Sequence, residues 1–293
     1  MSVEFQIEVD GGVLAGRRAD PSDKARIRGG PLIVAIHGGS YTSKYFDIAG
    51  YSLLDRAAAA GCSAVAFDRP GYGGSTLLEC EDAILQANAH RLEAGIAELW
   101  RRDNGQSSGV FLVGHSMGGA ISTLIAASEP SWPLLGLAVS GIALAHPEGV
   151  PAFEGEPPEE VYLEVPDEVK IGHMFGPEGT YAADAPKHSA AANHAVIFRE
   201  IIDINAFPSR ASDVYALVRA PVHYRHGEHD VLWSKAEGEV ERVAKAFVLS
   251  PRVDAALVVG AGHAIDFHHS GQELQQAQIA FAIGCAVLER GAD

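Results

Sequence analysis

Short apolar runs alternate with longer mixed segments along this chain of 293 residues. Four runs have the character of strands: Leu32 to Ile36, Ala64 to Phe67, Val110 to Val113 and Leu135 to Val139. Segments with helical character separate or follow them, at residues 51–60, 82–102, 118–128, 240–247 and 272–288. Strands that alternate with helices predict an α/β protein, in which a mostly parallel, doubly wound sheet carries helices on both faces.

The amino terminus alternates polar and apolar residues, which is the period of a strand and not the pattern of a secretion signal. We expect Val3 to Val9 and Val13 to Arg17 to form a hairpin across Asp10-Gly11-Gly12. Two further strands are expected later in the chain, one from Ala220 toward Asp230 and one over residues 256–259. No window of the sequence approaches the length of a membrane-spanning helix.

One stretch, residues 145–211, is too long for a simple crossover between two strands. Its first half, Pro147 to Lys170, is rich in Pro, Glu and Gly and is expected to be an irregular surface excursion. Its second half, Ala185 to Ile204, is rich in alanine and carries apolar residues, so a helix is expected there. This stretch, the inserted segment, interrupts the regular alternation within one expected domain, residues 1–293.

The composition is that of an ordinary globular protein, with 47% hydrophobic and 20% charged residues. Lys and Arg number 22 and Asp and Glu number 38, so the formal net charge is −16. Such a charge disfavours nucleic acids and anionic membranes as partners. Three cysteines without a Cys-x-x-Cys spacing, together with the absence of a targeting pattern, favour a cytoplasmic location. The sequence leaves the oligomeric state open.

The most informative motif is Gly114-His115-Ser116-Met117-Gly118. It directly follows a predicted strand and precedes a run of small, helix-prone residues. A serine on so sharp a turn needs small residues two positions before and after it, and Gly114 and Gly118 occupy those positions. The turn exposes the Ser116 hydroxyl and puts the Met117 amide at a helix N-terminus. The arrangement is typical of a nucleophile elbow.

A serine nucleophile needs a base, and the base needs an orienting carboxylate. Downstream of Ser116, Asp230 ends the turn after one predicted strand, and His263 lies just past the end of another. The carboxyl ends of parallel strands share one edge of a sheet, so we expect these three residues to meet as a triad. Glu228 is the main alternative for the acid, and Asp266 is a weaker one because it follows the base in the chain.

Four motifs, in this order, resemble the α/β-hydrolase superfamily over nearly the whole chain: residues 37–40 (His-Gly-Gly-Ser), residues 68–75 (Asp-Arg-Pro-Gly-Tyr-Gly-Gly-Ser), the elbow, and the loops that carry Asp230 and His263. The resemblance implies that fold and a hydrolase of the esterase, lipase, lactonase or epoxide-hydrolase kind. Epoxide hydrolases and dehalogenases of this fold carry Asp at the elbow, so Ser116 argues against both. The resemblance also implies that the inserted segment, residues 145–211, is a cap that covers the active site.

By the same resemblance, the Met117 amide and one amide of the turn after His37 form an oxyanion hole. Gly39 is the expected second donor. Ser40 is the alternative, because some relatives have a longer glycine run with a shifted donor. His37 is expected to brace this turn and not to act as the base.

We therefore expect a cofactor-free serine hydrolase that cleaves a carboxylic ester, lactone or thioester of a small to medium, neutral and rather apolar molecule. The residues expected to line its pocket are Tyr41, His173, Met174, Phe175, Tyr181 and Trp233. The same triad is compatible with carbon–carbon bond hydrolysis, acyl transfer or a lyase reaction, and a non-catalytic small-molecule binding protein is a remote alternative. No metal is expected, because the spacing of His223, His226 and His229 alternates faces on a strand.

Overall fold

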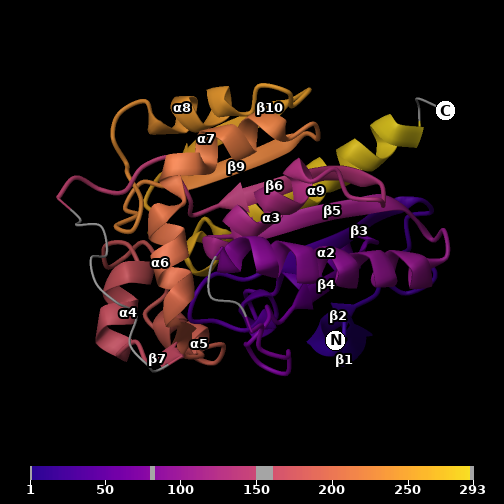
Figure 1. The fold of residues 1–293 in the computed structure, drawn as a ribbon, viewed down its shortest axis with the longest axis horizontal. Helices are drawn as coiled ribbons and strands as arrows, with labels where there is room; N and C mark the ends of the chain where they lie inside the picture. The colour runs from indigo at the N-terminus through magenta and orange to yellow at the C-terminus, as the bar shows by residue number, and fades with distance from the viewer. Residues whose placement is uncertain (1, 80–82, 150–160, 291–293) are drawn as a thin grey trace.

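One sheet of eight strands runs through the part of the protein that the computed structural model describes, residues 2–79, 83–149 and 161–290 (Figure 1). Its strand order is β1-β2-β4-β3-β5-β6-β9-β10. The strands are β1 (Val3–Val9), β2 (Gly12–Ala19), β3 (Gly30–Ile36), β4 (Ser63–Phe67), β5 (Ser107–His115), β6 (Leu134–Ser140), β9 (Val222–Gly227) and β10 (Val253–Val258). β2 is antiparallel to β1 and β4, and the other neighbours are parallel. The predicted α/β class with a mostly parallel sheet is confirmed.

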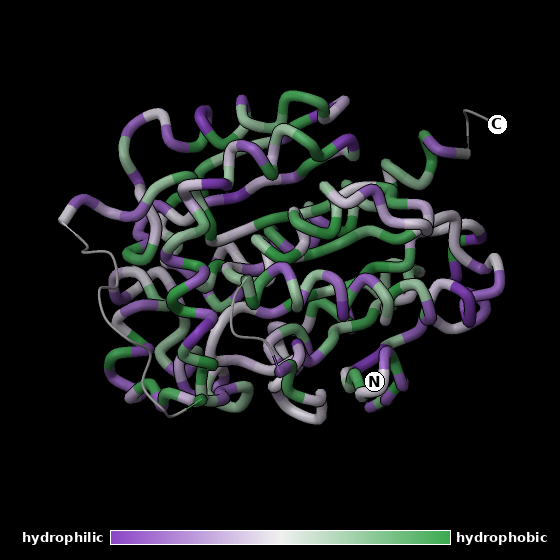
Figure 2. The backbone as a smooth tube through the Cα atoms, in the orientation of Figure 1, coloured by the Kyte–Doolittle hydropathy of each residue, from purple (hydrophilic) through white to green (hydrophobic). Residues whose placement is uncertain are grey.

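Helices cover both faces of this sheet. On one face lie α2 (Ile84–Asp103), α3 (Met117–Ala127), α7 (Pro208–Leu217) and α8 (Glu239–Ala246), and on the other lie α1 (Leu53–Ala59) and α9 (Gly271–Arg290). Short 3-10 helices cover Ser43–Phe46 and Ile265–Phe267. Figure 2 shows the same layering in hydropathy, with hydrophobic positions along the central strands and hydrophilic ones on the outer loops and helices.

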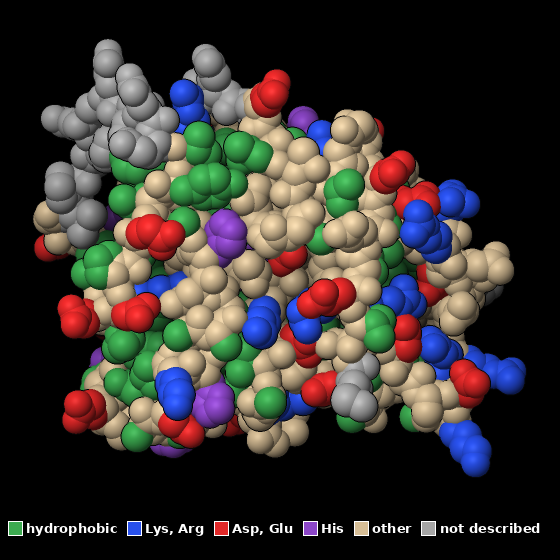
Figure 3. Space-filling model, turned by 90° about the horizontal axis from the view of Figure 1, so that it is seen from below, with side chains coloured by type: hydrophobic (Ala, Val, Ile, Leu, Met, Phe, Trp, Pro, Cys, Tyr) green, Lys and Arg blue, Asp and Glu red, His purple; other side chains and the backbone are tan. Residues whose placement is uncertain are grey.

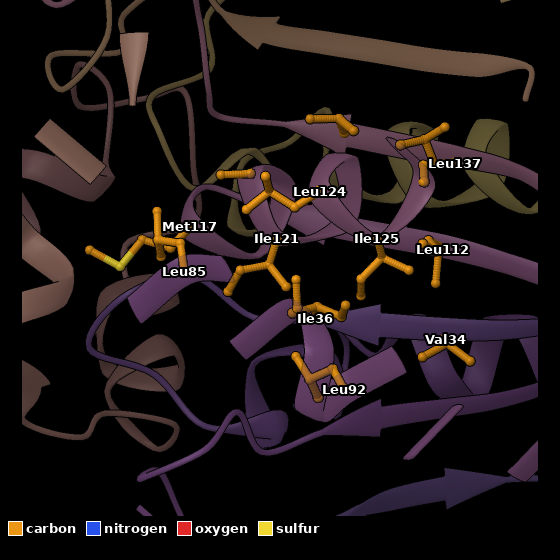
Figure 4. Packing of buried hydrophobic residues seen from close by; sticks show 14 of the residues in the cluster. Val34, Ile36, Leu85, Leu92, Leu112, Met117, Ile121, Leu124, Ile125 and Leu137 are labelled. Carbon is orange, nitrogen blue, oxygen red and sulfur yellow. The ribbon is translucent and has the colours of Figure 1, made fainter. Parts of the chain in front are cut away.

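Side chains of β3 show why the sheet has two covered faces. Leu32, Val34 and Ile36 are buried in one hydrophobic cluster with residues of α2 and α3, part of which is drawn in Figure 4. Ile33 and Ala35 are buried in a second cluster with residues of α1 and α9. Successive strand residues point to opposite faces, so an apolar run without polar positions is stable only between two layers.

The inserted segment forms a group of short elements at one end of the sheet (Figure 1). They are β7 (Tyr162–Leu163), α4 (Asp167–Met174), α5 (Ala185–Ala190), β8 (Val196–Ile197) and α6 (Phe198–Ala206). α7, which begins at Pro208, packs against α3 and so belongs to the helix layer over the sheet. On the face drawn in Figure 3, acidic and basic side chains are interspersed, and hydrophobic ones gather toward the end that carries these short elements.

Two expectations for the inserted segment are wrong. The single helix expected from Ala185 to Ile204 is interrupted, because the β-branched pair Val196–Ile197 forms β8 and pairs with β7. The irregular excursion expected from Pro147 to Lys170 contains β7 and the first half of α4. Its residues 150–160 lie outside the described part of the chain.

None of the helices in the described ranges combines the length and the apolar character that crossing a membrane requires.

Candidate active site

Ser116 lies on the turn between β5 and α3, with backbone angles φ of 54° and ψ of −123°. Residues other than glycine rarely adopt such a conformation, so the surrounding packing must hold it. Only glycine fits two positions before and two positions after Ser116. A Cβ on Gly118 would lie 2.0 Å from the carbonyl oxygen of Ile36, and a Cβ on Gly114 would lie 2.4 Å from the carbonyl oxygen of Gly118. The Ser116 side chain lines a cavity of about 590 Å³.

His263 and Asp230 form a buried pair beside this cavity. The Nδ1 of His263 lies 2.8 Å from Oδ2 of Asp230, which is fully buried. The backbone N–H groups of Leu232 and Trp233 donate to Oδ1 of Asp230 at 2.9 and 3.1 Å. Burial alone would raise the pKa of Asp230, but the His263 ring and the surrounding donors hold this pKa below its ordinary value. Asp230 is therefore a carboxylate that fixes the orientation of the imidazole.

The two other candidate carboxylates bond to different groups. The carboxylate of Glu228 accepts a hydrogen bond from the backbone N–H of Gly260 at 2.8 Å. Asp266 accepts one from the hydroxyl of Tyr45 at 2.9 Å and one from the side-chain amide of Gln275 at 2.6 Å. Burial raises the pKa of Asp266. Of the three candidate carboxylates, Asp230 is thus the one that is hydrogen-bonded to His263.

The turn after β3 lies directly against the nucleophile. A Cβ on Gly38 would lie 3.0 Å from Cβ of Ser116, and one on Gly39 would lie 3.0 Å from the sulfur of Met117. Met117 is the first residue of α3, so its N–H has no acceptor within the helix. In Figure 4 its side chain lies at the edge of the core cluster, with the sulfur directed away from the other labelled residues. Gly39, Ser40, Ser116 and Met117 all line the same cavity.

Buried polar groups stabilise the turn after β3 through hydrogen bonds. His37 donates from Nδ1 to the carbonyl oxygen of Gly38 at 2.8 Å and accepts at Nε2 from the backbone N–H of Arg69 at 3.0 Å. Burial lowers the pKa of His37 well below its ordinary value, so the ring is neutral. The Arg69 guanidinium also donates to the Gly38 oxygen at 3.3 Å, and it makes a bidentate ion pair with Glu200 at 2.5 and 2.9 Å. Neither member of this pair is exposed.

Four of the six residues expected to line the pocket do so, namely Tyr41, His173, Met174 and Trp233. The described lining does not include Phe175 or Tyr181. The rings of these two residues pack against each other, with centroids 4.7 Å apart, and both contact the ring of His268.

The polar groups near the site that were not expected from the sequence include Lys170, His146 and Glu200. Lys170 and His146 line the cavity, and the His146 ring stacks on Trp233 with centroids 4.7 Å apart. Glu200 reaches the site through Arg69. All three belong to the inserted segment, where no strand end or known motif predicts their position. The spacing from Lys170 to Met174 is one helical turn and was the available signal for Lys170.

Among the described residues, no group of three or more His, Cys, Asp and Glu side chains is arranged to hold a metal ion. His223 and His226 are buried on β9.

A sequence profile described as "Alpha/beta hydrolase family" matches residues 33–277. The chain belongs to the alpha/beta hydrolase family. Among curated proteins, this α/β hydrolase is similar to protein phosphatase methylesterase 1 of Mus musculus, with 32% identity over 108 residues. Those residues are 37% of this chain and 26% of the relative, so the match spans far less than half of the relative's length.

Solved structures share the fold of this α/β hydrolase along most of its length. A monoacylglycerol lipase of Paleococcus ferrophilus has a TM-score of 0.68 and 19% identity, over 93% of this chain and 99% of that one. A thermophilic esterase from Thermogutta terrifontis has a TM-score of 0.67 and 17% identity, over 97% and 99%. A haloalkane dehalogenase variant from Bradyrhizobium elkanii has a TM-score of 0.69 and 15% identity, over the whole of both chains. At these identities the likeness is one of fold.

Proposed function

We propose that this α/β hydrolase is a serine hydrolase that cleaves a carboxylic ester, lactone or thioester through an acyl-enzyme. The observation that carries the proposal is the 2.8 Å hydrogen bond between His263 Nδ1 and Asp230 Oδ2, beside a cavity that Ser116 also lines. A carboxylate bonded to Nδ1 keeps the histidine lone pair on Nε2, where a base needs it. The rare backbone conformation of Ser116 supports the same assignment, because such conformations cluster at functional sites.

In this mechanism His263 takes the proton of Ser116 while the serine oxygen attacks the carbonyl carbon. The N–H groups of Met117 and Gly39, or of Ser40 in place of Gly39, stabilise the tetrahedral oxyanion. His263 then protonates the leaving alcohol or thiol, and the acyl group stays on the serine. Water activated by the same histidine releases the acid and restores the enzyme.

The lining of the cavity favours a small to medium, neutral and rather apolar substrate. Leu163, Val169, Met174, Val196 and Ile204 contribute apolar side chains from the inserted segment. A volume of about 590 Å³ is within the ordinary range for small-molecule sites. In this proposal the inserted segment, residues 145–211, is a cap of a single catalytic domain, and its side chains contact the part of the substrate remote from the reacting carbonyl.

Replacement of Ser116 by Ala tests the function. We expect Ser116→Ala to lower kcat on acetyl, butyryl and lactone substrates by at least about 10⁴-fold, because removal of the nucleophile abolishes the acyl-enzyme. It should also abolish labelling by a fluorophosphonate probe. The exposed serine Ser209 provides a matched control, and Ser209→Ala should keep wild-type rates and labelling.

A folded Ser116→Ala protein that keeps more than a few per cent of the hydrolytic activity would contradict the serine mechanism. Efficient probe labelling of the wild type without turnover of any ester, lactone or thioester would instead favour carbon–carbon bond hydrolysis, acyl transfer or a lyase reaction. Absence of both labelling and turnover would favour a binding protein.

A further inference from the structure

The backbone of Ser40 is held in an unusual conformation by residues of the inserted segment. Its φ angle is 57°, in the left-handed region that favours glycine. Its carbonyl oxygen accepts two hydrogen bonds, one from the backbone N–H of His194 at 3.0 Å and one from Nζ of Lys170 at 2.5 Å. Neighbouring residues continue the contact, because Tyr41 and Asn193 form an antiparallel bridge. Both donors to this carbonyl thus come from outside the turn itself.

Lys170 is buried, with 5% of its surface exposed, and its hydrogen bonds to the described residues all lie beside Ser40. Its ammonium group donates to Ser40 O and to Oδ1 of Asn193, each at 2.5 Å. It also lies 3.6 Å from the centroid of the Tyr41 ring. The described contacts of Lys170 are therefore a carbonyl, an amide oxygen and an aromatic face, and none of them is a carboxylate.

These contacts do not fully compensate for the free-energy cost of burying the charged ammonium group. An ammonium group loses its hydration on burial, and neutral acceptors repay only part of that cost. An apolar side chain of similar length could fill the same space without the loss. Lys170 and Met174 lie one turn apart on the buried face of α4, and both line the cavity that contains Ser116. The charge is thus kept next to the reacting groups.

We propose that Lys170 is a positioning residue for the oxyanion hole, which holds the Ser40 carbonyl so that the backbone amides of the turn face the reacting carbonyl oxygen. The inference rests on the proposed serine-hydrolase function. Lys170 acts through the carbonyl of Ser40, because its ammonium group is bonded to Ser40 and Asn193 and not to a reacting atom. The Ser40 carbonyl and the Ser40 N–H belong to adjacent peptide planes that meet at the Ser40 Cα. Holding the carbonyl therefore helps to fix φ and ψ of Ser40, and through them the direction of the Ser40 N–H and, one plane further, of the Gly39 N–H.

The charge on Lys170 makes this role dependent on pH. Burial lowers the pKa of Lys170 to about 7, against the opposing effect of Asp167 and Glu164. Of the other groups that face it, Tyr41 is neutral because burial raises its pKa, and His37 is neutral because burial lowers its pKa well below the ordinary value. The ammonium is therefore present below about pH 7 and is lost as the pH rises through that value. The neutral amine has one donor fewer, and its remaining bonds lose the assistance of the charge.

The experiment compares wild-type protein with Lys170→Met, Lys170→Arg and the control Lys187→Met, which removes an exposed lysine of α5 in the inserted segment. Phenyl acetate hydrolysis is followed by proton release from about pH 5.5 to 9, the range in which histidine and a lysine of lowered pKa titrate. We expect Lys170→Met to lower kcat about tenfold, less than the roughly 10²–10³-fold cost of losing an oxyanion donor outright. Its KM should stay within about twofold of wild type, since the ammonium group is bonded within the protein and Met keeps an apolar side chain of similar length at the cavity lining.

The shape of the pH profile separates this role from a merely structural one. Wild-type kcat should pass through a maximum and fall as the pH rises through about 7. Lys170→Met should lack this fall. Lys170→Arg keeps a positive charge at every pH tested, so it should recover part of the rate without the fall. Lys187→Met should match the wild type in rate and in profile.

Three results would overturn the inference. One is a wild-type kcat that stays level up to about pH 9. This measurement uses the wild type alone and so does not depend on whether a variant folds. The second is a Lys170→Met protein with the wild-type kcat and profile. The third is a change in KM alone, which would make Lys170 a substrate-binding residue. If wild-type protein hydrolyses phenyl acetate in any of these cases, the proposed function stands and only the role of Lys170 falls. Wild-type protein that neither hydrolyses esters nor reacts with a fluorophosphonate overturns both.

Discussion

Asp230 has no access to solvent, and its two oxygens are already occupied by the imidazole of His263 and the backbone N–H groups of Leu232 and Trp233. These hydrogen bonds fix the orientation of the carboxylate. In the proposed mechanism it holds the histidine in the tautomer that a base needs, and it stabilises the imidazolium that would form during the reaction. Because these donors lower its pKa, it remains ionised throughout the neutral range.

Replacement of Asp230 by Asn should keep the shape of the site and lower kcat by about 10⁴-fold, because an amide favours the wrong tautomer of the histidine. The matched control is Glu228→Gln on the same turn, which keeps an oxygen for the N–H of Gly260 and should be nearly neutral. Both would be measured as kcat on an acetyl ester, with circular dichroism as the test of folding. Loss of activity in the Glu228 variant alone would mean that the acid has been assigned to the wrong side of the turn.

The order of the residues predicted that Ser116, Asp230 and His263 lie at one edge of the sheet, since each follows a strand of one parallel sheet. In the structure Asp230 bonds to His263, and Ser116 and His263 line the same cavity. The lining residues were harder to predict. Met174 and Phe175 are adjacent in the chain, yet Met174 lines the cavity and Phe175 packs on Tyr181. Sequence alone did not reveal the helix that begins at Asp167 and therefore did not reveal which of its sides faces the site.

Helix α4 contributes Met174 to the cavity lining. We expect Met174→Ala to raise KM for a long acyl ester more than for an acetyl ester, because a buried side chain of this size contributes roughly 1.5–3 kcal/mol to apolar contacts. Phe175→Ala removes an apolar side chain from the adjacent position, outside the cavity lining, and should keep the wild-type ratio of kcat/KM between long and short esters. Equal ratios in wild type and both variants would show that α4 does not select the substrate.

The chain between α5 and α6 illustrates the limit of pattern recognition. Its alanines and apolar residues favour a helix, but residues 192–194 instead pair with residues 40–42 of the turn after β3. Val196 and Ile197 then pair with β7. The partners in the turn after β3 lie about 150 residues away in the chain, and those in β7 lie more than 30 residues away. Local propensity therefore does not predict these pairings.

The ion pair of Arg69 and Glu200 joins the inserted segment to the body of the molecule. Arg69 follows β4 and Glu200 belongs to α6, and the hydroxyl of Tyr72 donates to the same carboxylate at 2.6 Å. Both members of the pair are fully buried. A buried pair of this kind adds little net stability, but the loss of one partner leaves an uncompensated charge.

Glu200→Gln should therefore lower the free energy of unfolding by about 3–5 kcal/mol, measured by urea denaturation. The control is Glu129→Gln, which breaks the exposed ion pair of Glu129 with Arg219 and should leave the midpoint nearly unchanged. A Glu200→Gln midpoint equal to that of the control would mean that the two parts of the molecule are held together without this pair.

The layout of the whole sheet was the most predictable level of this structure. The apolar runs of β3, β4, β5 and β6 are long enough and apolar enough to require cover on both faces, whatever their neighbours. The arrangement of the inserted segment was not predictable in the same way. Its position depends on buried polar pairs such as Arg69 with Glu200 and on the bonds of Lys170, which no hydrophobic period encodes.

The bonds between the inserted segment and the 40–42 turn also bear on how a substrate would enter under the proposed function. A cover that swung aside would break the hydrogen bonds at Ser40 and Thr42 and so distort the turn beside the nucleophile. Among the described residues, the exposed side chains Leu163, Val169 and Val231 lie on the cavity lining, so a substrate that entered without moving the inserted segment would pass them. In that case the space between these three side chains would limit the cross-section of the molecules that reach the cavity.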